Sequence, residues 1–442
     1  MDKSLQITTT PITFAIMQQI DFQRIHYLLC CLLAFVIPFP FRFAPVAIIL
    51  VAVAWVFSGQ WRSIGAYLKT SPVLVCWIIF YGLHLAGYFY SHNKIAAGFE
   101  LERKLSFWVL PLVLYSSFYR SSRRFAYLLL SFMAGLCAIA LWCLARATFL
   151  FAADSNLSHF FYHALAGGTD ANAVYTSWYV VCALVLLLFY PWQKIEATFS
   201  RNLRWAMGVL LGIFLILLAS RLLLVLFFVV VLPVYILRAW RSGRLPAAKM
   251  VWLGGTLALL LLLLAATRNP VSGRFHEILN KNAAQAFYPD YHQRDQQFNN
   301  LTLRLFLWRV GMDNMREHRL WAFGAGIGDV ADLQNERMAA LGIKDIYNKQ
   351  NPSQYAGLNL HNMYMQTLVS LGIPGLLLFC YLVGWPLGLL RLRWQEKLPL
   401  FLVLAVAALF MLQEAALQTQ AGIVFYLFCS VAIYNRYQAV KS

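Results

Sequence analysis

The feature that most constrains this chain is the recurrence of apolar runs of 15 to 25 residues, from one end of the sequence to the other. A helix needs about 20 such residues to cross the hydrocarbon core of a bilayer. Charged residues make up only 12% of the chain, against roughly 25% in soluble globular domains. The sequence therefore predicts an all-α polytopic membrane protein.

Twelve segments have the length and composition of membrane spans. The least obvious pair comes from residues 205–237, an apolar stretch of 33 residues with Arg221 in its middle. One helix of that length would measure about 50 Å, against a hydrocarbon core of about 30 Å. Basic residues flank both ends and favour the same cytoplasmic face, so the chain is expected to cross twice, with a break at Arg221. The predicted spans are residues 26–41, 43–58, 72–91, 105–119, 125–152, 174–191, 205–219, 221–237, 250–266, 361–390, 397–413 and 421–435.

The distribution of basic residues predicts the orientation of these spans. With the N-terminus in the cytoplasm, the short cytoplasmic segments hold 19 Lys and Arg residues and the short outer loops hold five, in agreement with the positive-inside rule. We therefore expect nine spans in residues 1–266, a periplasmic loop domain in 267–360, and three spans with a cytoplasmic C-terminus in 361–442.

The long outer loop is expected to be partly helical. A connection of 94 residues is far longer than usual and indicates a functional segment or a small domain. Its stretch "TLRLFLWRVGMDNMREHRLW" has apolar residues at helical spacing, and "GAGIGD" is expected to end that helix. The glycines match neither the dinucleotide fingerprint nor a phosphate-binding loop with its lysine.

Charge and ligand patterns argue against several classes. The net charge of +18 comes largely from basic residues that flank the apolar runs, which argues against nucleic acid as a partner. All eight cysteines lie within apolar runs, so neither a disulfide framework nor a metal–thiolate site is supported. His159 and His163 stand four residues apart, with Asp154 and Asp170 nearby, but no further ligand follows at a telling spacing. We expect no metal and no other cofactor.

Three polar residues stand at the outer ends of predicted spans. Arg221 lies at a depth where an isolated charge costs about 2.5–3.5 kcal/mol, so it either reaches the outer headgroups or faces a cavity that receives an anion. His361 opens the apolar run "HNMYMQTLVSLGIPGLLLF" and is either a structural cap or a proton acceptor, a role that suits imidazole near neutrality. Glu414 follows the eleventh span as a solvated carboxylate, a partner of an arginine, or part of the same site.

Arginines of the outer loop complete the candidate site. Arg304 and Arg309 lie on the predicted outer helix, and Trp308 can pack along the stem of Arg304 four residues earlier. Arginine binds phosphate groups through paired hydrogen bonds, and fixed cations stabilise charge that develops on a departing diphosphate. With a histidine as base, these residues predict displacement of a pyrophosphate leaving group by an alcohol, from a lipid-linked diphospho-sugar.

Four motifs together resemble those of the bacterial O-antigen ligase and polymerase superfamily. "HNMYMQTLVSLGIPGLLLF" is similar to its H-N-x-Y-[LM] segment, and "TLRLFLWRVGMDNMREHRLWAFGAGIG" to its [ST]-x-R-x-x-x-W segment with a glycine-rich turn. "SR" at residues 220–221 resembles the start of a family helix, and "EAALQTQAG" resembles its E-x-x-L-x-x-Q-x-G pattern. The resemblance covers residues 205–435. The chain differs at Arg319, where family members often have proline, and at Asn172, near which some have a histidine.

The resemblance implies a metal-independent glycosyltransferase of the bacterial inner membrane with its active site facing the periplasm. Its donor would be an undecaprenyl-diphosphate-linked glycan and its acceptor a sugar hydroxyl of lipid A–core, in lipopolysaccharide biosynthesis. By position, Arg221 and Arg304 would bind the diphosphate and His361 would be the catalytic base. The binding residues would be Arg221, Arg304, Trp308, Arg309, Asn362, Tyr364 and Glu414.

Three other activities stay open on the sequence. An O-antigen polymerase and a protein O-oligosaccharyltransferase share the motifs and differ in the acceptor, and the single long outer loop favours the ligase. A secondary transporter would show interrupted apolar segments in matching halves and a polar site near the midplane. Here the polar residues are expected at the outer rim, beside lipid.

Overall fold

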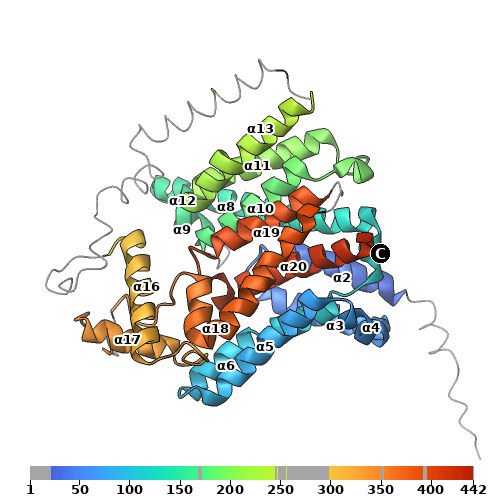
Figure 1. The fold of residues 1–442 in the computed structure, drawn as a ribbon. Helices are drawn as coiled ribbons and strands as arrows, with labels where there is room; N and C mark the ends of the chain where they lie inside the picture. Colours follow the sequence, from blue (N-terminus) through green and yellow to red (C-terminus); the bar gives the residue numbers. More distant parts are fainter. Residues whose placement is uncertain are drawn as a thin grey trace, which may run out of the picture.

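The computed structural model describes residues 21–167, 172–243, 298–348, 353–391 and 396–441, together with residues 246, 255 and 350. Every regular element in these residues is a helix, which confirms the all-α class. The helices form a bundle from which α16 and α17 extend to one side (Figure 1). The bounds are α2 Phe22–Val36, α3 Phe43–Phe57, α4 Ile64–Lys69, α5 Pro72–Tyr90, α6 Lys94–Arg103, α7 Ser106–Val113, α8 Ser122–Asp154, α9 Tyr162–Ala166, α10 Ala173–Phe189, α11 Arg201–Leu218, α12 Arg221–Val225, α13 Leu232–Arg241, α16 Asn300–Glu317, α17 Val330–Ala340, α18 Met363–Gly384, α19 Lys397–Phe410 and α20 Gln420–Lys441.

Several helices of the described chain are long and apolar enough to cross a membrane. Five meet this criterion, and a sixth is added if α3 and the segment Gln60–Lys69, which meet at 76°, form one broken span. The chain is therefore a multi-pass membrane protein. Twelve spans remain a prediction. Three matching helices are short, α7 within predicted span 105–119 has eight residues, α20 does not meet the criterion, and residues 250–266 lie almost wholly outside the described residues. The five are α5, α8, α11, Arg221–Arg241 and Met363–Arg391, and the shorter apolar helices are α2, α10 and α19.

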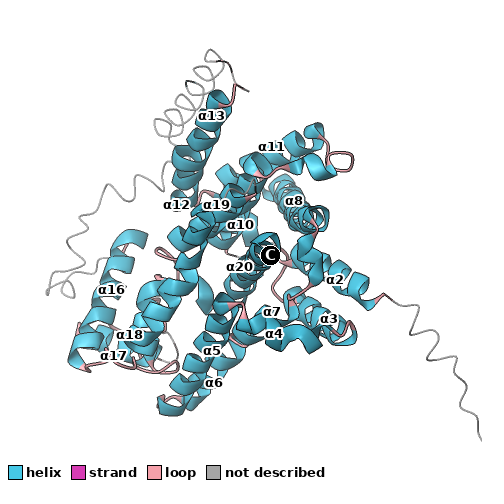
Figure 2. Ribbon diagram, turned by 45° about the vertical axis from the view of Figure 1, so that its right-hand side comes forward, coloured by secondary structure: helices cyan, strands magenta, loops and turns pink. Residues whose placement is uncertain are grey.

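The predicted break at Arg221 is confirmed. α11 ends at Leu218, Ala219 has a left-handed backbone conformation with φ of 49°, and α12 begins at Arg221. α12 continues through the π-helical stretch Leu226–Val231 into α13. Figures 1 and 2 show this segment running away from the break instead of prolonging the line of α11. The charged residue thus starts a new helix and does not lie within one.

The buried centre of the bundle is formed by α10 and α20, whose side chains are buried on most sides. A helix that is hydrophobic all round requires this position. Trp178 of α10 stacks on Phe410 of α19 and meets Phe425 of α20 edge-on, with ring centroids 4.7 Å apart in both pairs. A buried ion pair, Arg436 Nε to Glu396 Oε2 at 2.9 Å, holds α20 to the start of α19. The ring contacts hold α19 and α20 next to the connection that carries Glu414, and the ion pair joins the opposite ends of the same two helices.

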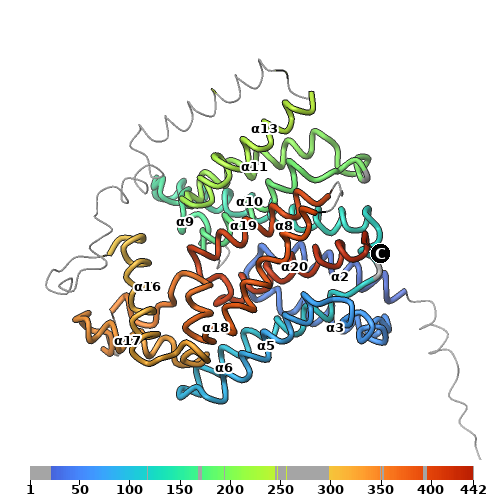
Figure 3. The backbone as a smooth tube through the Cα atoms, in the orientation of Figure 1, coloured from blue at the N-terminus to red at the C-terminus, as the bar shows by residue number. Residues whose placement is uncertain are grey.

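The described part of the outer loop has a hydrophobic core of its own. Phe306, Leu307 and Val310 of α16 are buried in a cluster with Leu360 and Val369, which lie around the start of α18. The expected outer helix is thus confirmed as α16, and its apolar face is the one predicted from the spacing. Figure 3 shows α16 and α17 beside α18, at one end of the bundle.

The end of α16 differs from the prediction. The helix stops at Glu317, before the glycines of "GAGIGD", and the chain turns at Arg319 with φ of 53°. Proline is restricted to φ near −65°, so this turn is closed to proline. Arg319 therefore occupies a backbone conformation that a proline at this position could not adopt.

Gly324 allows "GAGIGD" to pack directly on the backbone of α18. Ala325 N–H donates to Val369 O at 2.8 Å and Gly326 N–H donates to Ser370 O at 3.1 Å. A Cβ on Gly324 would lie 2.4 Å from the carbonyl carbon of Ser370, which real structures do not tolerate. The glycine-rich turn is therefore a packing element between the outer domain and α18.

α18 itself is interrupted at Gly372, where φ is 68° and ψ is −165°. This region of backbone space is essentially restricted to glycine. The interruption is closed by a hydrogen bond from Ile373 N–H to Trp321 O at 2.8 Å. The first glycine of "LGIPG" is thus required by the backbone conformation at the contact with the outer domain.

Replacing Gly372 by alanine is expected to destabilise the protein by about 1–3 kcal/mol or more, the usual cost of a strained backbone position. The added Cβ would also lie 2.8 Å from backbone atoms of residues 321–323. The matched control is Gly212→Ala on α11, where nothing lies within 4 Å of the new Cβ and a gain of up to about 1 kcal/mol is expected. Thermal unfolding in detergent measures both. Equal melting temperatures would contradict the backbone assignment.

Candidate functional site

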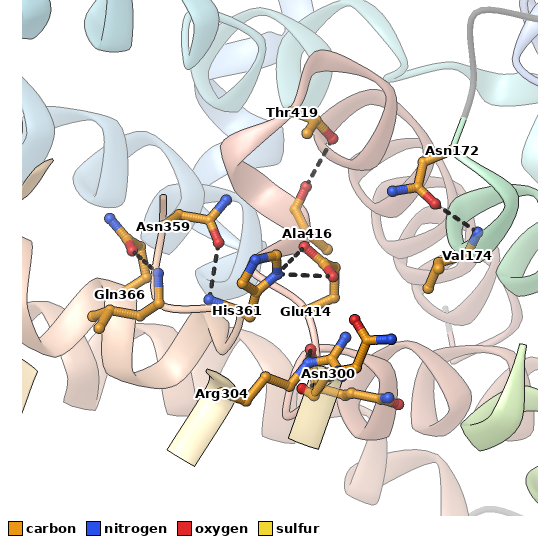
Figure 4. Close-up of polar contacts among 12 residues, drawn as sticks. Asn172, Val174, Asn300, Arg304, Asn359, His361, Gln366, Glu414, Ala416 and Thr419 are labelled. Atoms are coloured by element: carbon orange, nitrogen blue, oxygen red, sulfur yellow. Dashed lines mark hydrogen bonds and ion pairs between the residues drawn. The ribbon is translucent and has the colours of Figure 1, made fainter. Parts of the chain in front are cut away.

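The candidate site lies where three segments meet: residues 359–363 before and at the start of α18, the loop 411–415 after α19, and helix α16 (Figure 4). The first two segments are joined by a backbone hydrogen bond from Met363 N–H to Met411 O at 2.8 Å. The site is therefore built from the outer domain and from the ends of two apolar helices.

His361 and Glu414 form the centre of this junction. Nδ1 of His361 lies 3.3 Å from both carboxylate oxygens of Glu414. The Glu414 side chain is 8% exposed and the His361 side chain 25% exposed. The carboxylate is therefore not a solvated loop group, and a buried carboxylate is costly without a partner. Within the described residues its ion-pair partner is His361 and not an arginine, the other role considered from the sequence. The ring faces the carboxylate with Nδ1 and remains partly accessible.

The structural cap of α18 is Asn362, not His361. The Asn362 side chain accepts hydrogen bonds from Tyr364 N–H at 3.0 Å and from Met365 N–H at 3.1 Å. His361 stands one residue before the cap, with a left-handed φ of 43°, and its N–H donates to Asn359 Oδ1 at 2.9 Å. The cap interpretation of His361 is therefore wrong. The left-handed backbone at His361 sets the direction of its ring, and it lies between Asn359, which accepts its N–H, and Asn362, which caps α18.

α16 contacts both loops of the junction through two side chains. Arg304 Nε donates to Gln413 O at 3.0 Å, next to Glu414, and its Nη1 donates to Asn300 O at 3.1 Å. Trp308 Nε1 donates to Leu360 O at 2.9 Å, next to His361. Arg304 and Trp308 therefore lie next to the His361–Glu414 pair, and their contacts with a substrate remain predictions.

The other predicted residues have separate surroundings. Arg309 Nε lies 3.7 Å from Asp313 Oδ2, within an ion-pair network of the outer domain. The Tyr364 hydroxyl donates to Ala408 O at 3.1 Å and so joins α18 to α19. Arg221 is the partly buried first residue of α12, a different element. Substrate contacts for Arg309, Tyr364 and Arg221 therefore remain predictions.

Two further polar residues of the junction, Asn359 and Gln366, were not predicted from the sequence. Asn359 holds the backbone of His361, and the buried Gln366 accepts a hydrogen bond from Leu360 N–H at 3.1 Å through Oε1. Gln366 falls one helical turn after Asn362 on α18, a spacing that would have indicated a shared face.

Among the residues that the structure describes, no group of three or more His, Cys, Asp or Glu side chains is placed to hold a metal ion. His159 Nε2 lies 2.6 Å from Asp154 Oδ2 as an isolated pair. Asp170, the other carboxylate considered, lies outside the described residues.

Fold and site together define a class: a multi-pass membrane protein with an imidazole–carboxylate pair and an arginine where an outer helical domain meets membrane helices. A family model described as O-antigen ligase matches residues 206–380, so this segment of the chain is similar to the O-antigen ligase family. The matched segment includes Arg221, Arg304 and His361, while Glu414 lies beyond it. No curated protein matches the chain significantly.

Asn362→Ala is expected to lower stability by about 1 kcal/mol, because the first turn of α18 loses the side chain that caps two N–H groups. Asn362→Asp retains an acceptor in the same place and should keep most of that stability. Thermal unfolding of the two variants beside the parent protein is the measurement. A melting temperature for Asn362→Ala that equals the parent's would contradict the capping role.

Proposed function

We propose that this protein is a membrane glycosyltransferase that moves a glycan from an undecaprenyl-diphosphate donor to a sugar hydroxyl of lipid A–core. The family match supports a transferase of the O-antigen ligase type. The observation that carries the proposal further is the His361–Glu414 pair beside Arg304. It offers a proton acceptor and an anion-binding group within one junction.

His361 acts in this proposal as the general base. In the tautomer with the proton on Nδ1, the ring donates toward the Glu414 carboxylate, which lies 3.3 Å away, and Nε2 is left as an acceptor. Nε2 takes the proton of the acceptor hydroxyl while that oxygen attacks the anomeric carbon of the donor sugar. Glu414 orients the ring and stabilises the imidazolium that forms, the role of the carboxylate in a catalytic triad.

Arginines receive the charge that develops on the leaving group. As the new glycosidic bond forms, the bond between the anomeric carbon and the diphosphate oxygen breaks, and its electron pair leaves with undecaprenyl diphosphate. Arg304 binds that diphosphate in this proposal, with Arg221 as a second cation and Arg309, Trp308, Asn362 and Tyr364 around the sugar. Fixed guanidinium groups stabilise such charge without rearrangement at the moment of reaction. The reaction then proceeds without a metal ion, in the inner membrane and on its periplasmic side.

Arg304→Ala should abolish glycan transfer, and Arg304→Lys should restore only part of it, because an ammonium group cannot form the paired hydrogen bonds of a guanidinium. The control is Arg316→Ala on the exposed face of the same helix, which should transfer normally. Transfer is measured with purified protein and a lipid-diphosphate glycan. Normal turnover of Arg304→Ala would remove this residue from the mechanism.

His361→Ala should lower kcat by about 100-fold or more, the usual contribution of a general base. Glu414→Gln should lower kcat as well, because the glutamine cannot stabilise the imidazolium. Residues that act as a unit are not additive, so the double variant should be no slower than His361→Ala alone. Multiplicative losses in the double variant would show that the two groups act independently.

The acceptor decides among the activities that share these motifs. Purified protein is offered the lipid-diphosphate glycan with lipid A–core, with a second lipid-linked glycan, or with a serine-containing protein, each in the presence and absence of a chelator. Transfer to lipid A–core that is insensitive to chelation is the expected result. Transfer to the second lipid-linked glycan alone would identify a polymerase, and a requirement for a divalent ion would contradict the metal-free proposal.

A further inference from the structure

A cavity of about 470 Å³ opens on the far side of the α19–α20 connection. Its walls come from the turn 37–41 between α2 and α3, from Arg103 at the end of α6, from the start of α10, and from residues 418–421. The volume lies within the range of pockets that hold small ligands, about 300–1,000 Å³. Phe39, Phe41, Tyr175 and Tyr179 make much of the wall apolar, and among the described residues that line the cavity Arg103 is the only charged one.

Arg103 keeps a positive charge at this cavity. Its Nη1 donates to Gln418 O at 3.0 Å and to the Glu100 carboxylate. The same carboxylate also pairs with Lys104, which is 1% exposed; burial lowers the pKa of Lys104, and Glu100 opposes that shift. One carboxylate therefore faces two basic groups, and the partly exposed Arg103 is the one that borders the cavity.

The polar part of the wall is held rigidly. The Tyr179 hydroxyl donates to Ala421 O at 3.0 Å, and Gln420 Nε2 donates to Ser106 Oγ at 3.2 Å. Asn172 caps α10 by accepting from Val174 N–H at 2.9 Å. Such a preformed wall of amides, aromatic rings and one guanidinium is typical of a ligand site.

The cavity and the candidate site share one stretch of chain. Glu414 contacts His361, and Gln418, four residues later, accepts from Arg103. The short 3-10 segment Ala416–Gln418 lies in this stretch, so the two contacts are only four residues apart along the chain. In Figure 4, Arg304 lies below the His361–Glu414 pair, Thr419 lies above it and Asn172 lies to its right.

We propose that this cavity is a second lipid-phosphate site, in which Arg103 binds the phosphate and the aromatic wall receives the first part of the hydrocarbon chain. A transferase with two lipid-borne substrates needs two such positions around one base, and Arg304 serves only one of them. The identity of the second lipid as a substrate rests on the proposed function, whereas phosphate binding at Arg103 does not.

The test measures the binding of two phosphorylated lipids to the full-length protein in phosphatidylcholine nanodiscs. Farnesyl diphosphate represents a prenyl donor and phosphatidic acid a phosphorylated acyl lipid, with farnesol and diacylglycerol as their uncharged counterparts. At least one phosphorylated lipid should bind tenfold or more tightly than its counterpart. Arg103→Gln should remove about tenfold of that affinity, the effect of one charge-assisted hydrogen bond, while Arg103→Lys retains part and Lys94→Gln at the other end of α6 changes nothing.

A second variant tests the site without changing Arg103 or its packing. Asn172→Asp still caps α10, because aspartate is an equally good cap, and it places a negative charge at the cavity wall. It should weaken binding of the phosphorylated lipid and leave binding of the uncharged lipid unchanged. Asn156→Asp, an exposed cap away from the cavity, should change the binding of neither lipid.

Equal binding of the phosphorylated lipids by the parent protein, Arg103→Gln and Asn172→Asp would overturn the proposal, even if glycan transfer occurs. Loss of affinity in both variants supports it, and the lipid affected identifies whether donor or acceptor occupies the cavity. Arg103-dependent binding in a protein that transfers no glycan would leave the site standing and contradict only the proposed function.

Discussion

The loop 411–415 is the part of the chain on which the candidate site depends. Three contacts from two segments hold it: Met363 N–H bonds to Met411 O, the His361 ring faces Glu414, and Arg304 Nε of α16 bonds to Gln413 O. Two of these contacts use backbone carbonyls, so they fix the path of the loop whatever its side chains are. The buried carboxylate of Glu414 is then directed toward the imidazole because the backbone on either side of it is held.

The outer domain and the membrane helices behave as one unit at this junction. The core of α16 includes Leu360 and Val369, the glycine-rich turn bonds to the backbone of α18, and the interruption at Gly372 is closed by Trp321 O. α16 therefore cannot shift relative to α18 without breaking several hydrogen bonds. This coupling explains why Arg304 on α16 and His361 before α18 keep a fixed position relative to each other although they are far apart in the sequence.

Local patterns were sufficient to predict part of this structure. The spacing of apolar residues predicted α16 and its buried face, and the charge in the middle of residues 205–237 predicted the break before α12. Long-range contacts were not accessible in the same way. His361 and Glu414 are 53 residues apart, and nothing in either local sequence indicates their pairing without the family resemblance. The capping role also could not be assigned, because a histidine and an asparagine in adjacent positions are both able to cap a helix.

Contacts to backbone atoms were the least predictable. Arg304 and Trp308 reach the carbonyl groups of Gln413 and Leu360, and a carbonyl group has no sequence signature. The sequence does not distinguish Arg103 from other basic residues of short outer loops, because its proposed role depends on the cavity that packing creates beside it. Gly372 is an exception, because its positive φ essentially requires glycine at this position. The conformation is therefore reflected in the residue type.

The central claim is that one lipid diphosphate binds beside Arg304 at the junction that holds His361 and Glu414, with Arg221 of α12 as a second cation. The most direct measurement is an electron cryo-microscopy structure with a non-hydrolysable lipid-diphosphate glycan bound. We expect diphosphate oxygens within hydrogen-bonding distance of both guanidinium groups, with the anomeric carbon of the donor sugar on the side of Nε2 of His361. A diphosphate bound elsewhere, with Arg304 and Arg221 too far apart to contact it together, would contradict the account.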